Sequence, residues 1–350
     1  MPRVRVVHTT EYRYARPVRL TTHRLMLRPR DSHDLRLIDA TIGVTPAPAS
    51  TRWAHDVFAN SVAFLNWNAE RSDALRITSV LDLEHFPGTA AMPRETIDPI
   101  AETYPFSYAQ DEYPDLARLI ERHYPDPDRS IDNWARSFLN RAGPTVTMEL
   151  LSAMTSAIKA DFTYELREAA GTNSPVETLA TRHGACRDFA LLMMEAVRSL
   201  GFAARFVSGY LYDEALVDGG DAGADGTGAG NVGGGFTHAW CSVYLPGAGW
   251  VEFDPTNGLI AGRNLIRVCV ARTPGQAVPV AGGFVGQTGD FTGMRVNVEV
   301  TVVEPEASVE APVEAEQEGE VIEQPPEGED DGIPSGEPAP STSTGGSTGA

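Results

Sequence analysis

Three residues of the chain carry the side chains of an activated nucleophile: a cysteine, a histidine and an aspartate. They are Cys186, His238 and Asp254, in that order along the sequence. In such a set the thiolate attacks an acyl carbon, the imidazole transfers the proton, and the carboxylate holds the imidazole in the required tautomer. The chemistry that these residues could perform is therefore acyl transfer or hydrolysis through a thioester.

The residues that follow Cys186 predict a helix that begins at the cysteine. Apolar residues recur there at the spacing i, i+3, i+4, i+7 of one helix face, namely Phe189, Leu192, Met193, Ala196, Val197 and Leu200. Gly201 then marks the end of the helix. Because unpaired N–H groups at a helix N-terminus stabilise an anion, this position favours the reactive thiolate of Cys186.

His238 and Asp254 are predicted to lie on two neighbouring antiparallel strands. Strand-like segments flank residues 245–249, which contain Pro and Gly and resemble a turn. A register that pairs Tyr244 with Ala248 would place His238 directly opposite Asp254, within contact distance. This register is assumed, and a slip by one residue would move His238 to the other face of the sheet.

Each of the three residues also has an ordinary structural interpretation. Buried cysteines are usually inert, a single histidine in a strand is often structural, and Asp before Pro often marks a turn. The combination of helix start, strand and adjacent strand in one order favours the catalytic interpretation. The alternative is a folded protein-interaction module with a vestigial site.

Four separated phrases contain or accompany these residues, at 182–190, 205–211, 238–240 and 250–258. In type and order they resemble the core of the bacterial transglutaminase-like superfamily, of the cysteine protease type. The resemblance implies an α+β class with a papain-like core, in which Cys186, His238 and Asp254 form the catalytic triad. It further implies amide bonds of peptides or proteins as substrates, with hydrolysis or amine transfer as the reaction.

The resemblance extends to the flanks of the core and has one departure. The stretch 1–90 resembles the β-rich domain that precedes this core in one bacterial branch, and Ile266 to Phe284 resembles the segment after it. The family often has Gln at the position of Arg187, whose guanidinium would place a positive charge beside the nucleophile.

Composition divides the chain into four regions. Short alternating runs predict a small β-sandwich in residues 1–90, followed by a linker and helices in 91–145. Residues 146–303 are expected to form the catalytic core with its following strands. Residues 304–350 contain thirteen acidic and no basic side chains, which predicts a disordered acidic tail. Helices are expected near residues 114–123, 130–141 and 147–160.

A Gly-rich insert separates the core strand at 203–212 from the strand that carries His238. Residues 218–235 contain nine glycines and three aspartates, a composition that predicts a flexible loop. A calcium-binding repeat is the alternative, but the pattern is not periodic. We expect the loop to lie near the mouth of the site.

Charge and cysteine content limit the partners. The formal net charge is −20, and no basic patch with interleaved aromatics is present, so we expect no nucleic acid partner. Cys241 and Cys269 lack paired spacing, so we expect no disulfide framework, no metal and no cofactor. No apolar stretch approaches ~18 residues and the first residues lack the apolar region of a signal peptide, which predicts no membrane partner and a cytoplasmic location. The oligomeric state does not follow from the sequence.

Overall fold

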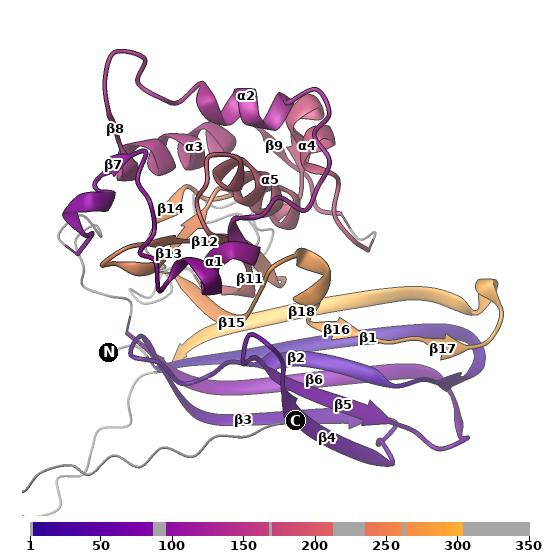
Figure 1. Cartoon of the computed structure of the whole chain (residues 1–350). Coiled ribbons are helices and arrows are strands. Elements are labelled where there is room, and N and C mark those ends of the chain that lie inside the picture. Colours follow the sequence, from indigo (N-terminus) through magenta and orange to yellow (C-terminus); the bar gives the residue numbers. More distant parts are fainter. Residues whose placement is uncertain (1–2, 87–95, 168–169, 213–234, 261–263, 304–350) are drawn as a thin grey trace, which may run out of the picture. The chain divides into compact units, whose positions relative to one another are not determined.

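The N-terminal part of the chain forms two antiparallel β-sheets that pack face to face (Figure 1). The structure is a computed structural model, and it describes residues 3–86, 96–167, 170–212, 235–260 and 264–303. One sheet has the strand order β17–β1–β6–β3, with β18 also paired to β1, and the other has the order β16–β2–β5–β4. The β-rich N-terminal domain expected from the sequence is thus confirmed.

Strands from both ends of the described chain build this sandwich. The first sheet contains β1 (Arg3–Leu20), β3 (Leu35–Thr45), β6 (Arg71–His85), β17 (Phe284–Val285) and β18 (Phe291–Val303). The second contains β2 (His23–Arg28), β4 (Ser50–His55), β5 (Ser61–Asn66) and β16 (Val280–Ala281). The expected grouping of residues 280–303 with the core therefore differs from the observed pairing. Strand β18 pairs along most of β1 and covers an edge that would otherwise expose unpaired backbone groups.

Strand β1 is one long strand instead of the separate short runs that the sequence predicts. Its pairing with β6 shifts in register between Arg13 and Val18. Val4 and Val6 of β1 belong to a buried cluster that includes Tyr210 of the following domain, whereas Val18 packs inside the sandwich. A single strand thereby contributes to two hydrophobic clusters.

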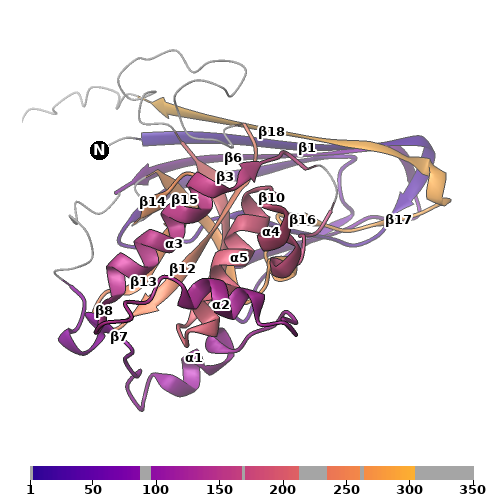
Figure 2. The same ribbon diagram turned by 90° about the horizontal axis from the view of Figure 1, so that it is seen from above.

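The second part of the fold is a five-stranded antiparallel sheet with helices. Its strand order is β14–β13–β12–β11–β15. The strands are β11 (Ala204–Leu211), β12 (His238–Leu245), β13 (Gly249–Asp254), β14 (Leu259–Ile260) and β15 (Leu265–Ala271). The helices are α1 (Tyr113–Ile120), α2 (Ser130–Arg136), α3 (Thr147–Asp161), α4 (Pro175–Thr181) and α5 (Cys186–Ser199) (Figure 2). The ranges of α3 and α5 agree with those expected from the sequence, whereas α2 ends at Arg136 instead of near residue 141. Two short pairs, β7 (Thr103–Tyr104) with β8 (Thr145–Val146) and β9 (Thr163–Tyr164) with β10 (His183–Gly184), complete the set.

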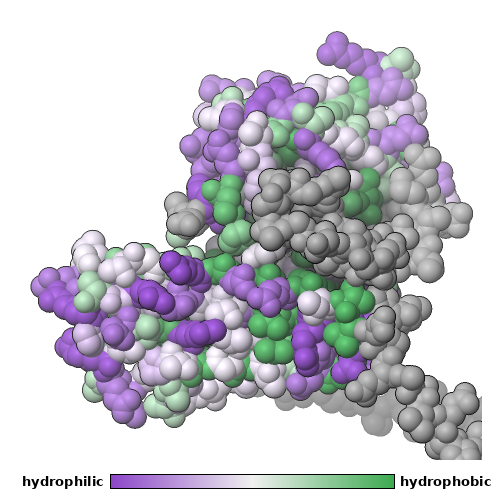
Figure 3. All heavy atoms as spheres, turned by 180° about the vertical axis from the view of Figure 1, so that it is seen from behind, coloured by the Kyte–Doolittle hydropathy of each residue, from purple (hydrophilic) through white to green (hydrophobic). Residues whose placement is uncertain are grey.

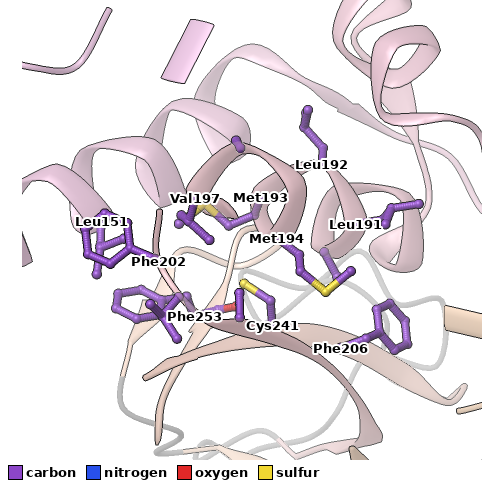
Figure 4. Packing of buried hydrophobic residues seen from close by; sticks show 14 of the residues in the cluster. Leu151, Leu191, Leu192, Met193, Met194, Val197, Phe202, Phe206, Cys241 and Phe253 are labelled. Atoms are coloured by element: carbon purple, nitrogen blue, oxygen red, sulfur yellow. The ribbon is translucent and has the colours of Figure 1, made fainter. Parts of the chain in front are cut away.

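Helix α5 lies at the centre of this domain. Figure 4 shows Met193, Met194 and Val197 of the helix above Cys241 and Phe253 of the sheet, all in one buried cluster. The helix is buried on more sides than the amphipathic pattern predicts. Its polar residues near the C-terminus form a buried ion pair, because a buried charge requires a partner.

The surface exposes some large apolar side chains among polar residues, as the view in Figure 3 illustrates. The most exposed is Val57, and Trp53 is 46% exposed. Within the described ranges, none of the helices combines the length and apolar character that a membrane crossing needs. The predicted acidic tail at 304–350, and the predicted Gly-rich loop up to residue 234, lie outside the described residues.

Candidate active site

Cys186 is the first residue of α5, as the sequence predicts. The chain reaches it through β10, whose last residue is Gly184. A Cβ atom at Gly184 would lie 2.9 Å from the Cβ of Asp188 and 3.2 Å from the ring of Phe189. Glycine is therefore needed for the turn to approach the helix so closely, and the helix start holds the thiol at a defined position.

The carboxylate of Asp188 stabilises the turn that precedes the cysteine. This side chain is fully buried and accepts hydrogen bonds from the backbone N–H of Ala185 at 2.9 Å and of Asn173 at 2.7 Å. Arg167 donates to both of its oxygens, at 2.8 and 3.1 Å. No role for Asp188 is predicted from the sequence, although an acidic residue at the third position of a helix is a known capping signal.

His238 and Asp254 are in direct contact. His238 is the first residue of β12 and Asp254 the last of β13, and Nε2 of the imidazole lies 2.8 Å from Oδ2 of the carboxylate. Both side chains are fully buried. The contact between the two predicted site residues is therefore present in the structure.

The predicted register of this hairpin is wrong by two residues. The observed pairs are Tyr244 with Trp250 and Leu245 with Gly249, so His238 and Asp254 are not directly opposite. The turn falls later because Gly247 and Gly249 both have positive φ angles, which glycine adopts without strain. A shift by an even number of residues keeps every side chain on its face, which is why the contact survives.

Hydrogen bonds from residues other than His238 also fix the carboxylate of Asp254. Its Oδ1 accepts from the backbone N–H of Thr256 at 2.9 Å, and its Oδ2 accepts from the side-chain amide of Asn257 at 2.9 Å. The carbonyl of Asn257 in turn accepts a hydrogen bond from Nζ of Lys159 at 2.5 Å. Neither Asn257 nor Lys159 is predicted from the sequence to contact the site. The motif Asp-Pro-Thr-Asn, which predicts a turn after Asp254, is the sequence signal that precedes the side-chain amide of Asn257.

The electrostatics favour a charged pair of imidazolium and carboxylate. Burial by itself lowers the pKa of His238, but the charge and hydrogen bond of Asp254 and the thiol of Cys186 outweigh it and raise the pKa to about 10. Burial also opposes ionisation of Asp254, yet His238, Asn257 and Thr256 hold the pKa of this carboxyl below its usual range. The ring of Trp240 stacks on the imidazole with centroids 5.9 Å apart, which restricts its orientation.

Cys186 is a further polar neighbour of the imidazole, beside Asp254 and the amide of Asn257, which lies 3.5 Å from Nε2. The interaction between thiol and ring contributes to the raised pKa of His238. Asp254 occupies Nε2 of the imidazole. The buried Nδ1 has no conventional hydrogen-bond partner among the described residues, so it is the nitrogen that can exchange a proton with the sulfur of Cys186. The structure thus brings Cys186, His238 and Asp254 together.

The remaining cysteines and Arg187 have different surroundings. Cys241 and Cys269 are buried in the core, where burial raises the pKa of both thiols, that of Cys269 to about 12. The guanidinium of Arg187 donates a hydrogen bond to the carbonyl of Arg167 at 2.8 Å. The guanidinium of Arg187, which the sequence places beside the nucleophile, is thus bound to the backbone of Arg167, whose own side chain pairs with Asp188.

Comparisons with known proteins agree with this architecture. A model of the bacterial transglutaminase-like N-terminal region matches residues 4–84, and a model of the transglutaminase-like superfamily matches residues 132–255. The chain belongs to the transglutaminase-like superfamily. The second match contains Cys186, His238 and Asp254.

Relatives of this transglutaminase-like chain match it over nearly their whole length. An uncharacterized protein of Mycobacterium tuberculosis is 30% identical over 317 residues, which are 87% of this chain and 94% of the relative. An uncharacterized protein of Mycobacterium leprae is 24% identical over 317 residues, 86% and 99% of the two chains. The crystal structure of a candidate cysteine protease from Cytophaga hutchinsonii shares the fold, with a TM-score of 0.61, 18% identity and coverage of 87% and 92%.

Proposed function

We propose that this transglutaminase-like chain is a thiol enzyme that cleaves or transfers amide-linked acyl groups of peptides or proteins. The observation that carries the proposal is the buried His238–Asp254 pair, 2.8 Å apart, beside a cysteine at the start of a helix. A buried imidazole with a carboxylate on one nitrogen and a neighbouring thiol is the arrangement that activates sulfur for attack.

The proposed reaction has two halves. The thiolate of Cys186 attacks the amide carbon, the C–N bond breaks, and the leaving amine takes a proton from His238. A thioester remains on Cys186. Water or a second amine then attacks the thioester, His238 accepts the proton of the attacking group, and the acyl group leaves as an acid or as a new amide. Asp254 stabilises the imidazolium in both halves.

The identity of the second nucleophile separates hydrolase from transferase. We propose hydrolysis as the basal reaction, because water, unlike a second amine substrate, needs no dedicated binding pocket. Incubation of the protein with a peptide library, with and without a primary amine, would distinguish the two by mass spectrometry. Loss of an amine with gain of water identifies hydrolysis, and incorporation of the added amine identifies transfer. No mass change with any peptide, in an assay able to detect single turnovers, would contradict the proposal.

Reactivity of the thiol separates an enzyme from a vestigial module. Iodoacetamide should label Cys186 of the native protein at pH ~7 far faster than Cys241 and Cys269, since only a thiolate is nucleophilic. The two core cysteines serve as internal controls, because each is held in the core by a thiol contact of 3.7 Å to a carbonyl. Equal, slow labelling of all three would favour the vestigial module. The cytoplasmic location and the absence of nucleic acid and membrane partners stay predictions.

A further inference from the structure

Tyr164 lies next to the turn that carries the nucleophile. Strand β9 pairs in parallel with β10, and this pairing sets Tyr164 beside Gly184. The backbone N–H of Glu165 donates to the carbonyl of Gly184 at 2.9 Å, which anchors the register. Cys186 follows Gly184 by two residues, so the backbone of Tyr164 is held beside the start of α5.

The side chain of Tyr164 is directed toward that helix start. Two residues earlier, the ring of Phe162 packs edge-on against Phe189 of α5, with centroids 5.8 Å apart. Residues two apart in an extended chain share a face, so Tyr164 projects to the same side as Phe162. Phe189 lies one helical turn after Cys186, and the step from Phe162 to Tyr164 leads back toward the cysteine. Tyr164 accordingly packs against the buried cluster that includes Cys186.

The hydroxyl of Tyr164 is suited to donate a hydrogen bond. The side chain is half-buried, and no hydrogen bond to its hydroxyl is present among the described residues. Burial, together with electrostatic interactions with Cys186 and Asp254, raises the pKa of Tyr164, although Arg187 opposes this. The phenol therefore keeps its proton at neutral pH and lies within the electrostatic reach of both residues.

We propose that Tyr164 donates the second hydrogen bond to the oxyanion formed when Cys186 attacks an acyl group. The first donor is the backbone N–H of Cys186, which as the first residue of a helix has no partner within the helix. On attack, the S–C bond forms and the C=O π electrons move to oxygen, where both donors stabilise the charge without losing their protons. On collapse, that electron pair re-forms C=O and the C–N bond breaks. This inference rests on the proposed function and assigns a further catalytic residue to it.

The test compares two reactions of the same thiol. In the full-length chain, Tyr164→Phe removes only the hydroxyl and keeps the ring. With p-nitrophenyl acetate as the acyl probe, the rate constant of the nitrophenolate burst should fall about a hundredfold, the usual effect of losing one oxyanion donor. Alkylation by iodoacetamide displaces iodide and forms no oxyanion, so its rate should change less than about twofold.

Tyr104→Phe is the matched control. Tyr104 packs against the same buried cluster, and its ring stacks on that of Phe202 with centroids 5.5 Å apart. The Tyr104→Phe variant should leave the rates of acylation and alkylation unchanged. If Tyr164→Phe leaves the burst unchanged, or slows alkylation as much as acylation, Tyr164 does not bind the oxyanion. If the burst persists in Cys186→Ala, the proposed function fails and the role of Tyr164 with it.

Discussion

At the scale of single residues, the candidate site depends on contacts that the sequence predicts unevenly. Cys186, His238 and Asp254 could be named from residue types, a helix start and two strands. The stacked ring of Trp240 could not, because this contact depends on the path of β12, and for the amide of Asn257 the Asp-Pro-Thr-Asn motif indicated a turn but not the contact. Tyr164 could not be identified either, because it lies on a parallel strand of two residues, which is too short to show a periodic pattern.

Loss of any member of a cooperating set should remove most of the rate. We expect Cys186→Ala to lower kcat by more than about a thousandfold and His238→Ala by nearly as much. The double variant should be no slower than either single one, because the residues act on the same step. Initial rates with p-nitrophenyl acetate and melting temperatures would check this. Multiplicative losses in the double variant would show that the residues act independently.

Cys269→Ala is the control for cysteine loss. Its thiol is buried near the carbonyl of Ala277, on strand β15, which β11 separates from the strand β12 that carries His238. We expect it to lower stability by about 1 kcal/mol through lost packing and to leave kcat unchanged. A rate loss comparable to that of Cys186→Ala would remove the distinction between core and nucleophilic thiols.

Asp254→Asn should be milder than His238→Ala. The amide can still accept a hydrogen bond and hold the ring, but it withdraws the charge that raises the pKa of His238. The imidazole should then lose its proton at a lower pH than in the wild type, as measured by NMR titration of the ring. An unchanged titration would mean that another group, not Asp254, sets the protonation of His238.

At the scale of elements, the starts of the expected helices could be predicted almost to the residue, whereas the end of α2 and the strand registers could not. Helix α5 has a long periodic pattern and a defined start, so its bounds follow from the sequence. The hairpin register depends on which glycines take positive φ, and the pattern alone fits a shift of two residues equally well. Strand β4 is mostly exposed and has no inward-facing apolar pattern, so the sequence carries no signal for its bounds.

The ion pair between Arg167 and Asp188 should be the main support of the turn before Cys186. Asp188→Ala would leave the partly buried guanidinium of Arg167 and two backbone N–H groups without their acceptor. We expect this variant to lower the free energy of unfolding by about 3 kcal/mol. The exposed pair Arg118–Glu121 is the control, and Glu121→Ala should change stability by less than about 1 kcal/mol. Urea denaturation measures both. Equal effects would mean that burial of Asp188 contributes nothing.

At the scale of the whole described chain, buried histidines of the sandwich contact tyrosines of the core sheet. His8 of β1 lies 3.0 Å from the hydroxyl of Tyr210, and His85 of β6 lies 3.1 Å from that of Tyr212. The sequence predicted a sandwich and a core but not this interface, because it joins residues more than a hundred positions apart. Their cluster also explains why the sandwich and the core sheet belong to one compact unit.

This interface should make stability fall in acid. Burial lowers the pKa of both His8 and His85 to about 4, below that of an unfolded histidine. Protonation therefore favours unfolding: the stabilisation is complete above pH ~6.5 and is lost as the pH falls toward ~4. Melting temperatures across this range should decline more steeply for the wild type than for the double variant His8→Gln/His85→Gln. Parallel curves would assign the acid sensitivity to other groups.

Lys159 is the chain's one lysine, and its amine holds the carbonyl of Asn257 beside the candidate carboxylate. Reagents directed at lysine, such as succinimidyl esters or aldehydes, would therefore find a single internal side chain on this protein. Acylation of that amine removes its charge and weakens its bond to the Asp254 turn. Once the α-amine of the chain is blocked, coupling the protein to an amine-reactive bead would tether it at the site itself, and the activity left on the bead would report how far catalysis depends on that turn.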